Sequence, residues 1–124
     1  MKLAILALIL FTVTLSACAQ LALKLGVGAQ SFRNAMADGI VQTLFAAALN
    51  PLIWVGILIY VLSVALWLWV LSKVDLSVAY PFVGVSFVLT MLFGGIFLSE
   101  SITPMRLAGT LLIVAGCALV GRSA

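Results

Sequence analysis

Four polar residues recur at intervals of four along the first apolar segment of the chain: Thr12, Ser16, Gln20 and Lys24. In an α-helix each step of four residues turns about 40° around the axis, so the four side chains share one face. Hydroxyl and amide groups can hydrogen-bond a polar molecule, and an ammonium group suits a phosphate. Ionisable side chains within a bilayer almost always face the protein interior or a water-filled cavity. We therefore expect this stripe to line an interior path.

Three residues of the stripe also have a structural interpretation. Lys24 can extend its ammonium group to the membrane surface and mark the helix end. The hydroxyls of Thr12 and Ser16 can donate to carbonyl groups of their own helix. Their shared face with Gln20 nevertheless favours a lined cavity.

The composition predicts an integral membrane protein. The 124 residues are 66% hydrophobic and only 7% charged, which is far too apolar for a soluble domain of this length. The chain has no histidine, and its three acidic residues are Asp38, Asp75 and Glu100. Without a cluster of metal ligands or a nucleophile–base pair, we expect no metal site, no cofactor and no enzymatic activity. The net charge of +3 gives no reason to expect nucleic-acid binding.

We predict an all-α bundle of four transmembrane helices forming a single domain over residues 1–124. The spans are expected at about 3–25, 51–72, 76–98 and 104–121. Asn50-Pro51 and Thr103-Pro104 are typical helix starts. The short link between the second and third spans predicts that these two are antiparallel neighbours. The apolar run 39–49 covers half a bilayer, so it fits an interfacial helix or an early start of the second span.

The N-terminal segment has an alternative interpretation as a bacterial lipoprotein signal. Leu15-Ser16-Ala17-Cys18 resembles a cleavage site at which Cys18 would be lipidated and the first span removed. The apolar run continues to Leu25 and three spans follow, whereas lipoproteins lead into polar linkers. We therefore retain the first span, and interpret Cys18 and Cys117 as small core residues.

The membrane orientation is not predicted by the positive charges. Three cationic residues fall at each end of a four-span bundle: Lys2, Lys73 and Arg122 at one end, and Lys24, Arg33 and Arg106 at the other. The positive-inside rule thus gives equal numbers on the two sides. A transporter that assembles with a partner of opposite orientation would have such a balance, and so would one whose orientation is set by only one or two of these residues.

The last two spans contain residues suited to bending and close packing. Pro81 removes a backbone hydrogen bond and predicts a kink, and Gly84 lets another backbone approach. Beside this kink, Tyr80 is either part of a substrate wall or an interfacial anchor. Gly109 and Gly116 are seven residues apart and share a face, which predicts a helix–helix contact within the chain or with a partner.

Four stretches of the sequence resemble the drug/metabolite transporter (EamA-like) superfamily: Ala19–Lys24, Asp75–Phe82, Phe97–Glu100 and Gly109–Gly116. The four-span length is similar to its small members, the small multidrug resistance exporters and the aminoarabinose-phosphoundecaprenol flippase subunits. Small multidrug exporters have a membrane-embedded glutamate in the first span, and the matching position here is Ser16. The absence of a glutamate at this position argues against proton-coupled export of cationic drugs. Gln20 and Lys24 instead resemble the flippase subunits.

The resemblance implies transport of a polyprenyl-phosphate-linked sugar, or a similar anionic amphiphile, across the bacterial inner membrane. Lys24 would meet the phosphate, while the polar head would contact Gln20, Ser16, Thr12 and Tyr80. We expect a homodimer or a heterodimer with a similar four-helix subunit, since four helices enclose little volume. The alternatives are a small multidrug or metabolite exporter and a non-transporting membrane assembly subunit. Glu100 matches a recurrent superfamily position, where we expect it to pair with Arg106 or a backbone group.

Overall fold

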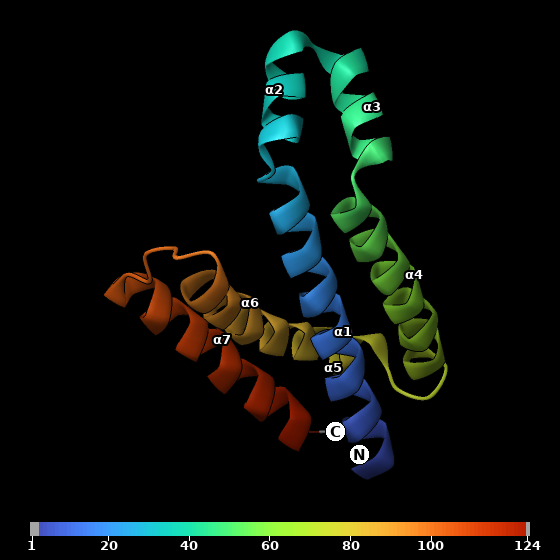
Figure 1. Ribbon diagram of the computed structural model, residues 1–124. Coiled ribbons are helices and arrows are strands. Elements are labelled where there is room, and N and C mark those ends of the chain that lie inside the picture. The colour runs from blue at the N-terminus through green and yellow to red at the C-terminus, as the bar shows by residue number, and fades with distance from the viewer. Residues whose placement is uncertain (1–2, 124) are drawn as a thin grey trace.

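Every element of the computed structural model, which describes residues 3–123, is a helix (Figure 1). Four stretches are long and apolar enough to cross a membrane: α1 (Leu3–Val27), α4 (Pro51–Leu71), a broken third span (Leu76–Phe97) and α7 (Pro104–Arg122). The predicted all-α membrane bundle is confirmed. The largest difference in bounds is at the end of the first span, expected near residue 25 and observed at Val27.

The short helix expected before the second span is present as part of a helical hairpin. α2 (Gln30–Asp38) and α3 (Ile40–Leu49) are joined at Gly39, whose φ of 135° is a conformation that glycine adopts readily. In Figure 1 the hairpin extends beyond the neighbouring ends of α1 and α4. The large apolar side chains Ile40, Leu44 and Leu49 of α3 are exposed.

α1 and α4 form the most closely packed pair of helices. The predicted start of α4 is confirmed: Asn50 Oδ1 accepts hydrogen bonds from the backbone N–H groups of Leu52 and Ile53. Asn50 Nδ2 also donates to the carbonyl oxygen of Gly26 at 2.8 Å, which ties the start of α4 to the end of α1. At Gly56 a Cβ atom would lie 2.7 Å from Leu23 Cγ, so the helices approach closely there because the residue has no side chain.

The third span is interrupted at the predicted kink. It consists of α5 (Leu76–Ala79), the 3₁₀ helix η1 (Tyr80–Val83) and α6 (Gly84–Phe97), with Pro81 in the first turn of η1. Gly84 lies directly against α7, where an added Cβ would come within 2.6 Å of Cys117 Sγ and Ile113 Cγ2. The close approach predicted at Gly84 is therefore present, and its neighbour is the fourth span.

The prediction that the second and third spans are antiparallel neighbours is wrong for most of the third span. Only the beginning of the third span, α5 and η1, contacts α4 appreciably, while α6 packs against α1 and α7. In Figure 1 the third span leaves α4 at an angle, so that α6 crosses α1 and runs away from α4. A small core of Ile9, Val70, Ala79 and Phe82 lies where α1, α4, α5 and η1 meet.

α7 is the least covered of the spans. Its predicted start is confirmed, since Thr103 Oγ1 accepts a hydrogen bond from the backbone N–H of Arg106. A Cβ atom built at Gly109 or Gly116 would meet no other heavy atom within 4 Å. The predicted glycine contact is thus not made within residues 3–123.

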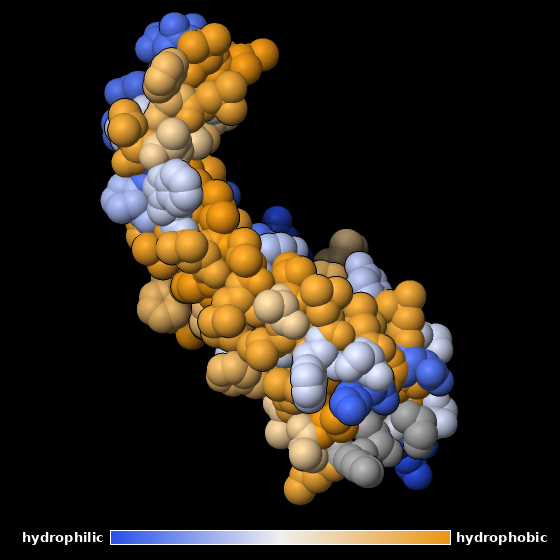
Figure 2. Space-filling view, turned by 90° about the vertical axis from the view of Figure 1, so that its right-hand side faces the viewer, coloured by the Kyte–Doolittle hydropathy of each residue, from blue (hydrophilic) through white to orange (hydrophobic). Residues whose placement is uncertain are grey.

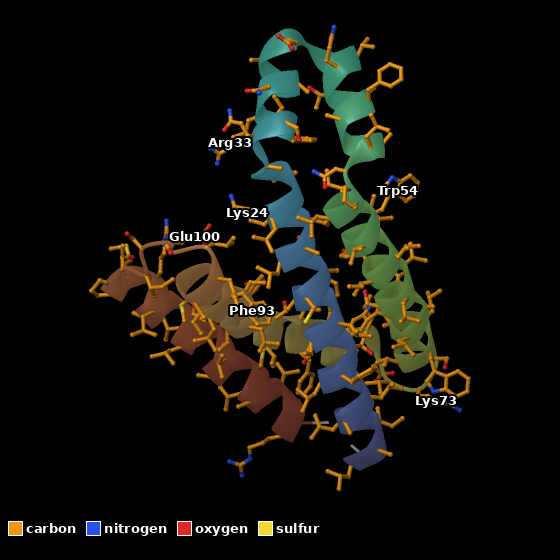
Figure 3. All side chains as sticks on the ribbon, viewed as in Figure 1. Lys24, Arg33, Trp54, Lys73, Phe93 and Glu100 are labelled. Carbon is orange, nitrogen blue, oxygen red and sulfur yellow. The ribbon has the colours of Figure 1, made fainter. Side chains whose placement is uncertain are left out.

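The surface of the molecule agrees with a membrane environment. Figure 2 shows apolar side chains over most of one face, with strongly hydrophilic residues mainly near the ends of the molecule. Figure 3 places Lys73 at the end opposite Lys24 and Arg33, as the four-span arrangement requires. Lys2, which was counted with Lys73, lies outside the described residues.

Candidate functional site

The polar face of α1 borders a cavity of about 510 Å³. Ser16, Gln20 and Lys24 contribute its α1 wall. The opposite wall is formed by α6 and the loop that follows it, and α4 contributes Tyr60. Three of the five predicted substrate-binding residues are therefore brought together at one cavity by the four-residue spacing of the stripe.

A second, smaller cavity of about 170 Å³ adjoins the first. Thr12, Ser16 and Tyr80 are among its lining residues. Ser16, Tyr60 and Ser86 line both cavities, which makes the two spaces neighbours along α1. Every residue of the predicted stripe thus lines one of two adjoining cavities, and Tyr80 lies at the end away from Lys24.

The hydrogen bonds divide the stripe into two kinds of residue. Thr12 is buried, and its hydroxyl donates to the carbonyl oxygen of Leu8 at 2.8 Å, as the structural interpretation anticipated. Within residues 3–123, no intrachain hydrogen bond engages the side chains of Ser16, Gln20 or Lys24. Their donors therefore remain available to a molecule in the larger cavity.

Lys24 occupies the last turn of α1 at the open end of the stripe. Its side chain is exposed, and a cation near the C-terminus of a helix is stabilised by the helix dipole. In Figure 3 this side chain leaves α1 toward the loop that carries Glu100. Both residues line the larger cavity, so the mouth of that cavity contains one cationic and one anionic group.

The wall opposite α1 was not identified by sequence reasoning. Ser86 and Thr90 repeat at an interval of four on α6, and the same interval leads to Gly94; all three line the larger cavity. This is the same signal that revealed the α1 stripe, but it is weaker. Serine and threonine in membrane helices commonly bond to their own backbone, as Ser86 does to Val83 and Thr90 does to Phe87.

Aromatic side chains complete the lining. Tyr60 borders both cavities from α4, and Phe87 and Phe93 border the larger one from α6. In the smaller cavity, the rings of Trp67 and Tyr80 meet edge to face with centroids 6.5 Å apart. Aromatic faces beside hydroxyl groups suit the apolar and polar surfaces of a sugar or another amphipathic ligand.

Within residues 3–123, Glu100 forms no ion pair with Arg106, which was one of the two partners expected for it. The Arg106 guanidinium donates to the carbonyl oxygen of Ser101 at 2.8 Å. Glu100 uses its backbone N–H to donate to the carbonyl oxygen of Gly94 at 2.9 Å, and its carboxylate side chain lines the cavity. In the described part of the chain, no three His, Cys, Asp or Glu side chains gather in a way that could hold a metal ion.

Comparisons with known proteins agree with this architecture. A model of the EamA-like transporter family matches residues 2–122. A probable 4-amino-4-deoxy-L-arabinose-phosphoundecaprenol flippase subunit ArnE from Pseudomonas paraeruginosa is 40% identical over 119 residues, which cover 95% of this chain and 97% of that protein. The subunit of the same name from Pseudomonas aeruginosa is 38% identical over 118 residues, with the same coverage of both chains.

A more distant relative carries the name of the other subunit. The probable flippase subunit ArnF from Shewanella sediminis is 33% identical over 125 residues, covering 91% of this chain and 84% of its own. No solved structure matches the chain. With four apolar spans and a family model that extends over nearly its whole length, the protein is a small multi-pass membrane transporter. The chain belongs to the EamA-like transporter family.

Proposed function

We propose that this protein is one subunit of a flippase that moves a polyprenyl-phosphate-linked sugar across the bacterial inner membrane. The relatives named above as flippase subunits support this substrate class and location. The observation that carries the proposal is the shared cavity of Ser16, Gln20 and Lys24, in which a cation lies beside uncommitted hydrogen-bonding groups. Such a set can hold a phosphate and an attached polar head at membrane depth.

Each lining residue has a role in this proposal. The Lys24 ammonium group pairs with the phosphate, and Gln20 and Ser16 hydrogen-bond the sugar hydroxyls. Thr12 and Tyr80 contact the head when it enters the smaller cavity, where Thr12 can still accept a hydrogen bond. The head thereby exchanges water for polar side chains along α1, while the polyprenyl chain stays in lipid.

The third span supplies the moving element of the mechanism. Pro81 lies in a 3₁₀ segment, and Gly84 begins α6 immediately afterwards. A helix already interrupted at this point can change its angle at lower cost than a continuous α-helix. We propose that rocking at η1 alternately exposes the cavities to the two sides of the membrane.

A similar four-helix subunit completes the transporter. Gly109 and Gly116 lie on an exposed face of α7 together with Met105, Leu112 and Leu119, at alternating intervals of four and three residues. This spacing is that of a helix which packs lengthwise against another helix. We propose that this α7 face, defined by these five residues, packs against the partner subunit.

Native mass spectrometry of protein released gently from membranes tests the proposal. We expect a co-purifying polyprenyl phosphate, or its glycosylated form, in the wild type and its loss in Lys24→Ala. Lys73→Ala is the matched control, because it removes a lysine from the opposite end of the molecule. Bulk phospholipid alone in the wild type, or equal retention of the polyprenyl lipid in Lys24→Ala, would contradict the proposed site.

Glu100 supports a second candidate function, the export of a cationic compound. Its carboxylate lines the larger cavity, so a cation could bind there although the first span has Ser16 at the exporter position. In that case tetraphenylphosphonium, a phosphate-free cation, should bind to the wild type and fail to bind to Glu100→Gln. Absence of binding to the wild type would eliminate this candidate.

A further inference from the structure

Glu100 is held in place by the way the chain leaves α6. Ser99 has a φ of 54°, which is uncommon for a residue with a side chain, and it turns the chain back over the last turns of the helix. The backbone N–H of Glu100 then donates to the carbonyl oxygen of Gly94 at 2.9 Å. The position of this residue is therefore fixed by a backbone hydrogen bond as well as by its place in the loop.

The carboxylate of Glu100 rests on the surface of α6 at a buried glycine. A Cβ atom added to Gly94 would overlap Glu100 Oε1. Gly94 itself lines the larger cavity, so the carboxylate occupies the edge of that cavity because position 94 has no side chain. Any larger residue there would have to displace the carboxylate.

The two charged side chains at the cavity mouth, Lys24 and Glu100, do not neutralise each other. Lys24 and Glu100 both line the cavity, and within residues 3–123 they form no ion pair with one another or with Arg106. The Arg106 guanidinium is engaged by the carbonyl oxygen of Ser101. One free cation and one free anion at the edge of a single cavity are complementary to a ligand that carries both a negative and a positive group.

We propose that Glu100 is a specificity residue that binds an ammonium group on the transported head, while Lys24 holds its phosphate. The inference rests on the proposed flippase function and assigns to one residue of this chain the recognition of the amine on a phosphate-linked amino sugar, the kind of head group that the names of the related flippase subunits give. Such a head group is zwitterionic at neutral pH. The phosphate alone recruits the lipid through Lys24. The carboxylate then distinguishes an amino sugar from the same sugar with a hydroxyl group in place of the amine.

Binding to two matched lipids tests the assignment. The full-length protein, in nanodiscs with the subunit that co-purifies with it, is titrated with two short-chain polyprenyl phosphates. One carries 4-amino-4-deoxy-L-arabinose and the other carries L-arabinose. We expect the wild type to bind the amino lipid roughly tenfold more tightly, since a hydrogen bond to a charged group is strong enough for such a preference.

Three variants locate the source of the preference. Glu100→Gln should bind both lipids equally, with the affinity that the wild type has for the arabinose lipid. Gly94→Ala should reduce the preference in the same way although Glu100 is retained, because its Cβ displaces the carboxylate. Asp38→Asn, which removes a carboxylate on α2 that does not line either cavity, should keep the full preference.

The possible failures are distinguishable. Equal binding of both lipids by the wild type, or a preference that survives in Glu100→Gln, would overturn the role of Glu100 and leave the flippase proposal standing. Binding of neither lipid by the wild type would overturn the proposed function and this inference together.

Discussion

The two helical pairs of this transporter differ in how completely they cover each other. The most apolar windows of α1 and α4 are 28% and 22% buried, whereas the third span is 17% buried and α7 only 6%. The α1–α4 pair is held by Asn50 and by close approach at Gly56. The α6–α7 pair is in contact at Gly84, but no part of residues 3–123 covers the opposite face of α7 at Gly109 and Gly116.

This difference suggests that the two helical pairs have different roles. Lipid tails are as apolar as leucine, so packing and hydrogen bonds, rather than the hydrophobic effect, hold membrane helices together. The α1–α4 pair has both and serves as the fixed wall that presents the polar stripe. In the described part of the chain the outer face of α7 has neither, and we expect the second subunit to supply them.

Filling the glycine contact between α1 and α4 should have the largest effect on the isolated chain. In Gly56→Val the new Cβ would lie 2.7 Å from Leu23 Cγ and 3.1 Å from the Ala19 carbonyl oxygen. We expect a loss of about 1–3 kcal/mol in the free energy of unfolding, typical of overpacking. Unfolding of the detergent-solubilised protein by SDS measures this change.

Gly116→Val is the matched control for that substitution. Its Cβ would meet no heavy atom within 4 Å, so the stability of the single chain should change by less than about 0.5 kcal/mol. Equal destabilisation by the two substitutions would contradict the contrast between the helix pairs.

Substitutions on the α7 face should weaken assembly with the partner subunit without destabilising the single chain. The double substitution Gly109→Leu and Gly116→Leu places two large side chains on the α7 face. We expect it to weaken association at least about tenfold, or ~1.4 kcal/mol, while the single chain stays folded. Crosslinking in membranes at graded expression measures the association. Unchanged association would show that the partner packs elsewhere.

A smaller loss should follow removal of the cap that joins α1 to α4. Asn50→Ala deletes the hydrogen bonds to Leu52 and to Gly26, and we expect a cost of about 1 kcal/mol. Thr103→Ala is the comparison, because Thr103 caps α7 without bonding to another helix. Thermal unfolding in detergent should show the larger shift for Asn50→Ala, and the reverse order would contradict the tie between α1 and α4.

The sequence predicted the helices better than their pairing. Apolar length and the Asn50-Pro51 and Thr103-Pro104 starts identified the spans, because these signals are local. The position of α6 could not be derived from the short link after α4, since such a link does not fix the angle at which the third span leaves α4 (Figure 1). Which two spans pack together depends on such angles and on glycine contacts such as Gly84, which a periodic pattern does not encode.

The sequence predicted one of the two walls of the candidate site. The α1 stripe contains an amide and a cation, whose presence in an apolar helix is costly enough to signal a cavity. The facing α6 stripe contains only hydroxyl groups that bond to their own helix, so it carried no such signal. Glu100 was expected to pair with Arg106 or with a backbone group, whereas the turn at Ser99 places its carboxylate beside Gly94 at the cavity.

The central claim is that the stripe ending at Lys24 handles the phosphate of a lipid-linked sugar. Its most direct test is the rate at which a fluorescent polyprenyl-phosphate sugar crosses the bilayer of vesicles containing the protein and its co-purifying subunit. We expect Lys24→Ala to abolish crossing, Lys24→Arg to retain part of it, and Lys73→Ala to match the wild type. Wild-type crossing by folded Lys24→Ala protein would contradict the account.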